Sequence, residues 1–138
     1  MVVKTYSNSG QYIKNRSRNK SEMLEDYVEV IKEFISSQGE ARGADLAKHF
    51  GVSHATITKN LKRLVSEKLI KTTPYRSIFL TEKGESLALK MREKHEIVIS
   101  FLRKIGVSQK TAQIDSEGIE HHVSDETLSV MKKFNKNF

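Results

Sequence analysis

The sequence contains no cysteine, which excludes disulfide bonds, thiolate metal sites and cysteine nucleophiles. It has no run of about 18 apolar residues, so a transmembrane helix is not expected. Its N-terminus also lacks the apolar core of a secretory signal. We therefore expect a cytoplasmic protein. With 138 residues, 30% of them charged, the chain is long enough for one domain or two small ones.

The net charge of +7 is spread unevenly along the chain. Residues 1–20 contain five basic side chains and no acidic one, residues 21–40 are acidic overall, and residues 41–90 are basic again. A basic segment of this kind is typical of a nucleic-acid-binding surface. Residues 1–20 show no sustained apolar period, so we predict a disordered basic arm. This arm either adds phosphate contacts on DNA or is an uncommitted solvated tail.

A first amphipathic helix is predicted from Ser21, a favourable N-cap, to Gly39, which ends it. Apolar residues recur at helical spacing between residues 23 and 35. Asp26 and Glu29 lie on the flank of this apolar stripe. Each acid taken alone is best explained as a solvated surface charge, and the pair gains interest only from a second cluster near residue 117.

Residues 42–50 and a longer helix from Ser53 to about residue 68 are predicted to form a helix-turn-helix, with Gly51 in the turn. In the longer helix the apolar residues expected to pack inward are Ile57, Leu61, Leu64 and Val65. The opposite face carries small, hydroxyl-bearing and basic side chains that suit entry into a DNA groove: Ser53, His54, Ala55, Thr58, Lys59 and Lys62. The alternative for this face is an ordinary solvated basic surface.

Residues 69–73 and 77–81 alternate in hydropathy as two short strands, with a turn at residues 74–76. Arg76 at the tip of this hairpin can meet phosphate or the minor groove. A helix, a helix-turn-helix and a hairpin in this order make a winged helix. The predicted fold is mostly α with a small β-hairpin. A winged helix-turn-helix domain over residues 21–90 is followed by an all-helical domain over residues 91–138.

The C-terminal part is predicted to begin with one long helix over residues 82–105. Ser108 then caps a short helix over residues 109–114, a further helix or helical turn follows, and a last helix covers residues 128–138. Short helices after a long one bury little core alone. We therefore expect this part to form a homodimer interface, as winged-helix repressors commonly dimerise on palindromic sites.

The segment at residues 115–123 places Glu117, Glu120 and His121 at i, i+3 and i+4, on one face of a helix. Two carboxylates and an imidazole converging there would repel one another or stay hydrated unless they bind a cation. Their donor atoms suit manganese, iron or zinc. Three ligands rarely complete a coordination shell, so we expect further ligands elsewhere in the chain.

Several segments in this order and spacing resemble the diphtheria-toxin-repressor family of metal-dependent regulators: residues 24–29, 52–61, 80–84, His95 and residues 117–124. The resemblance covers roughly residues 21–138. It implies a metal site between the first helix and the dimerisation domain, with the ligands Asp26, Glu29, His95, Glu117, Glu120 and His121. Without the resemblance, His95 would be interpreted as a structural or surface histidine. His122 matches no ligand position and is assigned a structural or supporting role.

Asp26 and Glu117 occupy the two positions at which the iron-responsive members place sulfur ligands. Their oxygen atoms suit manganese, so the resemblance is strongest to the manganese-responsive members. It implies a binuclear Mn²⁺ site in which Glu29 or Glu120 bridges, although Fe²⁺, Zn²⁺ or Cd²⁺ could occupy it. The SH3-like third domain of the longer iron-responsive members is not expected.

The resemblance implies a homodimeric repressor of metal-uptake genes, which Mn²⁺ fixes in the conformation that binds palindromic operator DNA. One alternative is an iron-responsive repressor of the same family. Another is a winged-helix regulator that needs no metal. A metal-dependent hydrolase is disfavoured, because no nucleophile motif or phosphate loop accompanies the cluster. We therefore expect a regulator and not an enzyme.

Overall fold

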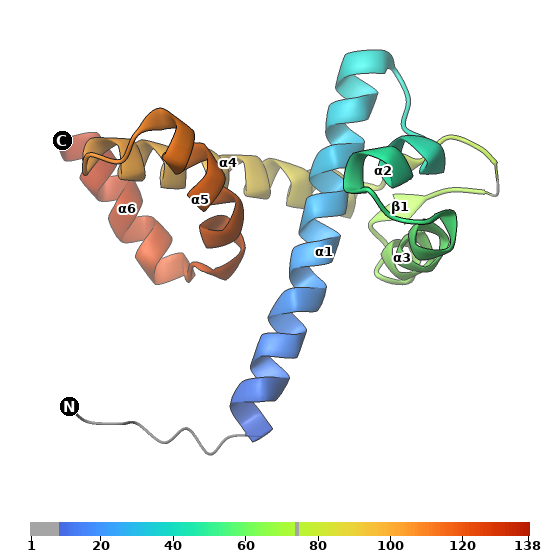
Figure 1. The fold of residues 1–138 in the computed structure, drawn as a ribbon, viewed down its shortest axis with the longest axis horizontal. Coiled ribbons are helices and arrows are strands. Elements are labelled where there is room, and N and C mark those ends of the chain that lie inside the picture. Colours follow the sequence, from blue (N-terminus) through green and yellow to red (C-terminus); the bar gives the residue numbers. More distant parts are fainter. Residues whose placement is uncertain (1–8, 74) are drawn as a thin grey trace.

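The computed structural model describes residues 9–73 and 75–138. Within them the order of elements is α1 (Ser9–Gln38), α2 (Gly43–Phe50), α3 (His54–Ser66), β1 (Ile70–Lys71), β2 (Phe79–Leu80), α4 (Glu82–Lys104), α5 (Gln109–His122) and α6 (Asp125–Asn137). Helices α2 and α3 and the hairpin lie near one end of α4. At the other end of α4, helices α5 and α6 pack against it. Helix α1 lies between these two groups (Figure 1). The predicted fold class is confirmed.

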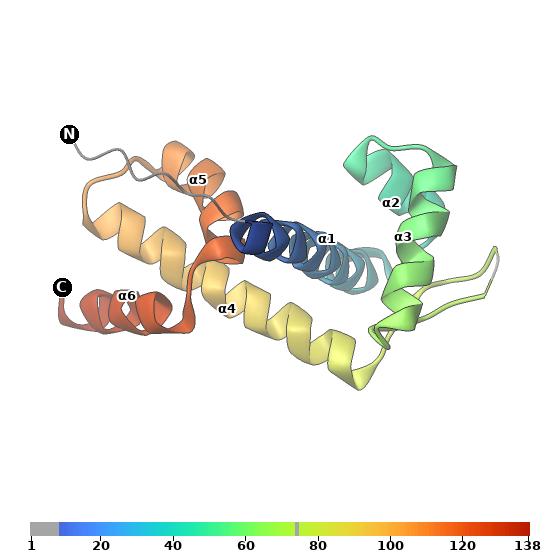
Figure 2. The same ribbon diagram turned by 90° about the horizontal axis from the view of Figure 1, so that it is seen from below.

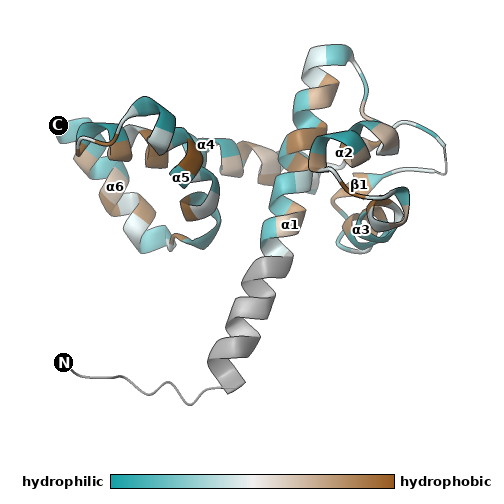
Figure 3. Cartoon of the chain, viewed as in Figure 1, coloured by the Kyte–Doolittle hydropathy of each residue, from teal (hydrophilic) through white to brown (hydrophobic). Residues whose placement is uncertain are grey.

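Helix α1 begins at Ser9 and not at Ser21, so residues 9–20 continue the helix where a disordered arm is predicted. No proline interrupts this segment, and a helix does not require the apolar period on which the prediction relied. Residues 1–8 of the predicted arm lie outside the described residues. In the part of α1 that Figure 3 colours, apolar residues lie where the helix meets the other elements.

The N-terminal core forms where α1 crosses α2, α3 and the hairpin. Its largest fully buried side chains are Val28, Ile31, Leu46, Leu64, Ile70 and Ile78. The strands pair antiparallel, with Ile70 opposite Leu80, and Ala41 bridges to Ile78 on the other edge. Gly84 lies against this junction, where an added Cβ would collide with the Leu69 carbonyl oxygen. The predicted winged helix is confirmed, with strands shorter than predicted.

The C-terminal unit is built on α4, against which α5 and α6 both pack (Figure 2). Its buried centre consists of Val98, Leu102 and Ala112, with partly buried residues such as Ile119 and Met131 around them. The prediction of two helical pieces over residues 109–122 was wrong, because α5 is continuous. Its residues 114–116 carry no helix breaker, and Gly118 is tolerated inside the helix.

Ser108 and Ser124 cap α5 and α6, accepting hydrogen bonds from the backbone N–H groups of Thr111 and Thr127. The predicted domain boundary after residue 90 falls inside α4, so this helix runs through both units. Among the helices of the described ranges, none combines the length and the apolar character needed to cross a membrane.

Candidate metal centre and DNA-binding face

Helices α1, α4 and α5 bring their acidic and histidine side chains together where α1 meets the C-terminal unit. Within the described residues, three groups offer ligand atoms that all lie within 4.8 Å of one another: His95–Glu117–Glu120, Glu29–Glu120–His121 and Glu22–Asp26–His121. Every ligand that the resemblance implied occurs in at least one group. Two residues, Glu120 and His121, occur in two groups each, so the three groups form one connected cluster.

The His121 side chain is only 1% exposed, which makes it one of the two most enclosed members of this cluster, together with Glu120. Its Nε2 lies 2.8 Å from Asp26 Oδ1 and 3.5 Å from Glu120 Oε1. The Asp26 oxygen is close but poorly aligned, so Nε2 has no hydrogen-bond partner among the described residues. A buried nitrogen without a partner is costly. Carboxylate oxygens crowd around it, which is the arrangement a cation would complete.

The electrostatics of His121 also favour a positive charge at this point. Burial alone would lower the pKa of His121, but the carboxylates of Asp26 and Glu25 outweigh burial and raise the pKa to about 10. The metal-free cluster therefore holds a proton on His121 near neutral pH. Since a divalent cation brings more charge than that proton, the oxygen-rich surroundings fit a metal well.

The carboxylates of Glu120 and Glu29 have too little positive charge near them to offset their burial. Glu120 is 1% exposed, and its Oε2 lies 2.6 Å from His95 Nδ1. Burial raises the pKa of Glu120, an effect that the nearby His95 opposes. Burial and then the charge of Glu120 raise the pKa of Glu29 to about 7. A bound divalent cation would relieve both penalties.

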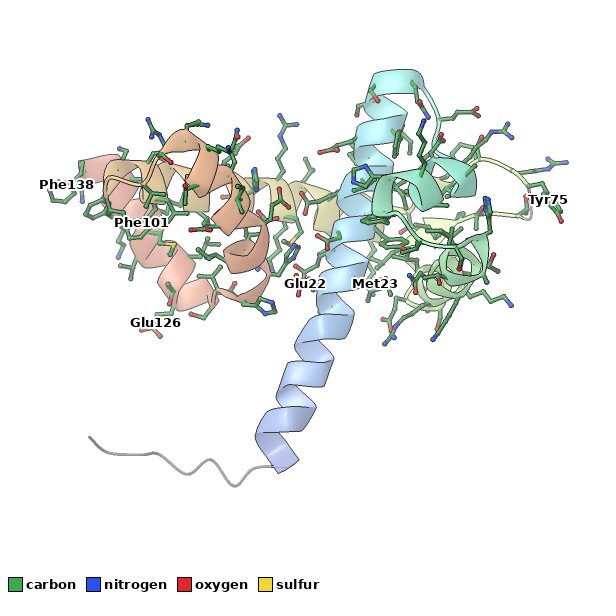
Figure 4. All side chains as sticks on the ribbon, viewed as in Figure 1. Glu22, Met23, Tyr75, Phe101, Glu126 and Phe138 are labelled. Carbon is green, nitrogen blue, oxygen red and sulfur yellow. The ribbon has the colours of Figure 1, made fainter. Side chains whose placement is uncertain are left out.

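Glu117 is exposed at the edge of the cluster, and Glu22 is a candidate that the sequence prediction left out. Glu22 projects from α1 on the side that faces the C-terminal unit (Figure 4). Its Oε2 lies 3.0 Å from His122 Nε2, which gives His122 a partner on α1. A helical spacing of four residues to Asp26 was the available signal, because it places both acids on one face.

The predicted DNA-binding face of α3 is open to solvent. Ser53, His54, Ala55, Thr58, Lys59 and Lys62 are all exposed. Two of them already make local hydrogen bonds, since Ser53 Oγ accepts from the Thr56 N–H and the Thr58 hydroxyl donates to the His54 carbonyl. Both residues are exposed, and their hydroxyl oxygens can accept further hydrogen bonds from a partner.

Ile57 and Leu64 are buried as predicted, and Leu61 is partly buried. The inward packing predicted for Val65 was wrong, because Val65 is 44% exposed near the end of the helix. Arg76 is exposed on the hairpin next to Tyr75, which is fully exposed and marks the tip of the wing (Figure 4). The hairpin and α3 lie at the same end of the molecule (Figure 2).

Two family models match the two units of the chain. The model described as "Iron dependent repressor, N-terminal DNA binding domain" matches residues 20–78, and "Iron dependent repressor, metal binding and dimerisation domain" matches residues 81–138. The transcriptional regulator MntR of Escherichia coli O6:H1 is 48% identical over 119 residues, which cover 86% of this chain and 77% of that protein. MntR of Geobacillus kaustophilus is 38% identical over 101 residues, covering 73% and 72% of the two chains.

Solved structures give the same relationship. The structure of the manganese regulator SloR matches with a TM-score of 0.71 and 26% identity over 82% of this chain. A manganese-dependent transcriptional repressor in complex with manganese matches with a TM-score of 0.73 and 26% identity over the same share. This chain spans about half the length of these structures, covering 53% and 52% of them.

Proposed function

Because this chain belongs to the iron-dependent repressor family and is MntR-like within it, we propose that it is a manganese-responsive repressor of metal-uptake genes, acting as a homodimer on palindromic operator DNA. The observation that carries the proposal is the buried Nε2 of His121. It lacks a hydrogen-bond partner in the described part of the chain and is surrounded by carboxylates from α1 and α5. The cluster thus has its members on both sides of the contact between the two units.

The proposed ligands are those implied by the sequence: Asp26, Glu29, His95, Glu117, Glu120 and His121. Glu120 shares one group with His95 and Glu117, and another with Glu29 and His121. This shared position supports a binuclear site in which Glu120 bridges. When bound, divalent manganese supplies the positive charge that these carboxylates lack.

Helix α1 carries the coupling between the metal site and DNA. One side of α1 bears Asp26 and Glu29, while Val28 and Ile31 on its other side are fully buried in the core of the winged domain. Fixing α1 against α5 therefore fixes the orientation of the winged domain, and with it α3. Without a cation, Glu29 of α1 and Glu120 of α5 repel one another, and the proton on His121 offsets this repulsion only in part. The two units are then held together less firmly.

Binding of metal and binding of DNA then favour the same arrangement. Each strengthens the other by the same coupling free energy, typically about 1–3 kcal/mol or about 5–150-fold in affinity. We assign the DNA contacts to the exposed residues of α3 and to the wing: Ser53, His54, Ala55, Thr58, Lys59, Lys62 and Arg76. The basic members reach phosphate or guanine, and the small or hydroxyl-bearing members allow close approach to base edges.

The oxygen atoms of Asp26 and Glu117 support manganese as the metal that activates this chain, because carboxylates suit Mn²⁺. Two of the similar solved structures, a manganese regulator and a manganese-dependent repressor, point in the same direction. Iron within the same site is the runner-up, since the family models are described as iron dependent. Zn²⁺ and Cd²⁺ share enough of this ligand chemistry to occupy the site as substitutes.

A DNA-binding titration tests the proposed function. A duplex is first selected from a random-sequence library at saturating Mn²⁺, and its affinity is then measured against Mn²⁺, anaerobic Fe²⁺, Zn²⁺ and EDTA. We expect a symmetric selected sequence and the tightest binding with Mn²⁺. Equal affinity in EDTA would overturn metal-dependent regulation, whereas activation by Fe²⁺ alone would replace manganese with iron.

A further inference from the structure

We propose that Glu25 is a positioning residue of the metal centre, which accepts a hydrogen bond from His121 Nδ1–H and so directs Nε2 toward the metal. The inference rests on the proposed function, because it concerns how one of the proposed ligands is presented. Glu25 is not among the ligands implied by the sequence, where it counts as one of several acids on the first helix.

The two side chains meet across the contact between α1 and α5. Glu25 Oε2 lies 3.2 Å from His121 Nδ1, although the residues are 96 positions apart in the sequence. The contact is enclosed, with exposed fractions of 15% for the Glu25 side chain and 1% for that of His121. A hydrogen bond shielded from water in this way holds the ring more firmly than an exposed one.

The two nitrogens of the His121 ring face different carboxylates. Nδ1 meets Glu25, whereas Nε2 points to Asp26 and Glu120 and has no hydrogen-bond partner among the described residues. A neutral imidazole carries one N–H and one lone pair. A carboxylate at Nδ1 favours the tautomer with the proton there, which leaves the lone pair on Nε2 for the metal.

Adjacent residues of α1 therefore have different roles. Asp26 and Glu25 approach the same imidazole at opposite nitrogens, Asp26 among the candidate ligand atoms and Glu25 outside them. The neighbouring pair of Glu22 and His122 lacks this arrangement, because both side chains are substantially exposed, at 31% and 40%. An enclosed contact to a proposed ligand distinguishes Glu25 from the other acids of the helix.

The test uses the full chain with ¹⁵N-labelled histidine and Zn²⁺, a diamagnetic probe for the site. Glu25→Ala, Glu25→Gln and the control Glu33→Ala, an exposed acid on the same helix, are compared with the wild type. In the Zn²⁺-loaded wild type we expect a His121 Nδ1–H signal that exchanges slowly with water. Glu25→Ala should lose that signal and about 10–100-fold in Zn²⁺ affinity, the usual cost of losing such a partner.

Glu25→Gln separates positioning from a simple ion pair, because its carbonyl oxygen can accept the same hydrogen bond without a charge. We expect the Nδ1–H signal to return and the Zn²⁺ affinity to lie between those of Glu25→Ala and the wild type. No recovery in Glu25→Gln would overturn the inference in favour of a charge-dependent contact or direct ligation by Glu25. Glu25→Ala with the affinity of Glu33→Ala would overturn it as well.

Failure of the inference and failure of the proposed function give different results. If the wild type binds neither Zn²⁺ nor Mn²⁺, the metal centre itself is wrong. If the wild type binds metal and His121→Ala weakens binding while Glu25→Ala does not, only the positioning role is wrong. Thermal unfolding of each metal-free variant shows whether a loss of affinity comes from a damaged fold, and Glu25→Gln keeps the test decisive if Glu25→Ala does not fold.

Discussion

Asn60 Nδ2 donates a 2.8 Å hydrogen bond to Tyr27 Oη, which joins α3, the proposed DNA-binding helix, to α1, which carries two of the proposed metal ligands. Tyr27 directly follows Asp26 in the sequence and is 4% exposed. Its ring stacks on Phe50 of α2, with centroids 4.4 Å apart and planes inclined by 7°. Tyr27 therefore contacts both helices of the helix-turn-helix, so a shift of α1 would displace a residue that is hydrogen-bonded to α3.

Replacing Tyr27 by phenylalanine removes this hydrogen bond and keeps the ring. We expect the free energy of unfolding to fall by about 1 kcal/mol, the usual net value of such a bond. DNA affinity at saturating Mn²⁺ should also fall, because α3 loses a contact that orients it on α1. Chemical denaturation and DNA titration measure the two effects. Tyr75→Phe, the same change at a fully exposed position, is the control for stability, and unaltered DNA affinity in Tyr27→Phe would contradict the link.

Substitution of Glu120, which is buried, and of Asp26, which is partly exposed, should separate metal response from folding. We expect Glu120→Ala and Asp26→Ala to remain folded dimers and to lose the about 5–150-fold gain in DNA affinity with Mn²⁺. DNA titration with and without Mn²⁺ measures the gain, and sedimentation measures the dimer. Glu96→Ala is the control, since Glu96 is an exposed acid whose one ion pair within the described residues is with Arg92 on the same helix. A full Mn²⁺ response in either cluster variant would remove that residue from the site.

Glu29 should make the stability of the metal-free chain depend on pH. Burial and then the charge of Glu120 raise the pKa of Glu29 from 4.5 to about 7. Between these values the folded chain holds a proton that the unfolded chain has released, so folding becomes less favourable as the pH rises through this range. Glu29→Gln carries no such charge. Its stability relative to the wild type should rise with pH and level off above about pH 7.

The free energy of unfolding of Glu29→Gln should exceed that of the wild type by on the order of 1 kcal/mol above about pH 7. This is less than the full pKa shift implies, because Glu29 is only partly buried and solvent screens its charge. Denaturation in EDTA between about pH 4 and pH 8 measures it. Glu33→Gln, at an exposed position of the same helix, is the matched control. A difference between Glu29→Gln and the wild type that does not change with pH would rule out Glu29 as the source.

The features that the sequence predicted well are those with local causes. A helix cap such as Ser108 depends on a hydrogen bond three residues away, and the turn glycine Gly51 adopts a left-handed φ of 64° that its position demands. The early start of α1 and the continuity of α5 were missed for a related reason. An apolar period marks a helix face that packs, whereas a polar segment can extend a helix without that signal.

Contacts between distant segments could not be predicted in the same way. Tyr27–Asn60 and Glu25–His121 join residues 33 and 96 positions apart, and nothing in the neighbourhood of either residue indicates its partner. The proposed ligands were assembled from α1, α4 and α5 only through the family resemblance. Spacing alone grouped Glu117, Glu120 and His121, because these three lie on a single helix.

Substitutions on the proposed DNA-binding face should leave the metal centre unaffected. Lys59 and Arg76 are exposed on α3 and the wing, and neither belongs to the clustered metal-binding groups. We expect Lys59→Ala and Arg76→Ala to weaken DNA binding and to leave Mn²⁺ affinity unchanged, as measured by DNA titration and calorimetry. If the lost contact is to phosphate, the salt dependence of DNA binding should fall by about one unit of slope; a lost base contact instead costs about 1–3 kcal/mol and relaxes the sequence preference.

Lys110→Ala, which removes an exposed basic residue of α5, supplies the control for net charge. An equal loss of DNA affinity in Lys110→Ala would reduce the effect to overall charge, whereas altered Mn²⁺ affinity in Lys59→Ala would mean that the two surfaces are not separate.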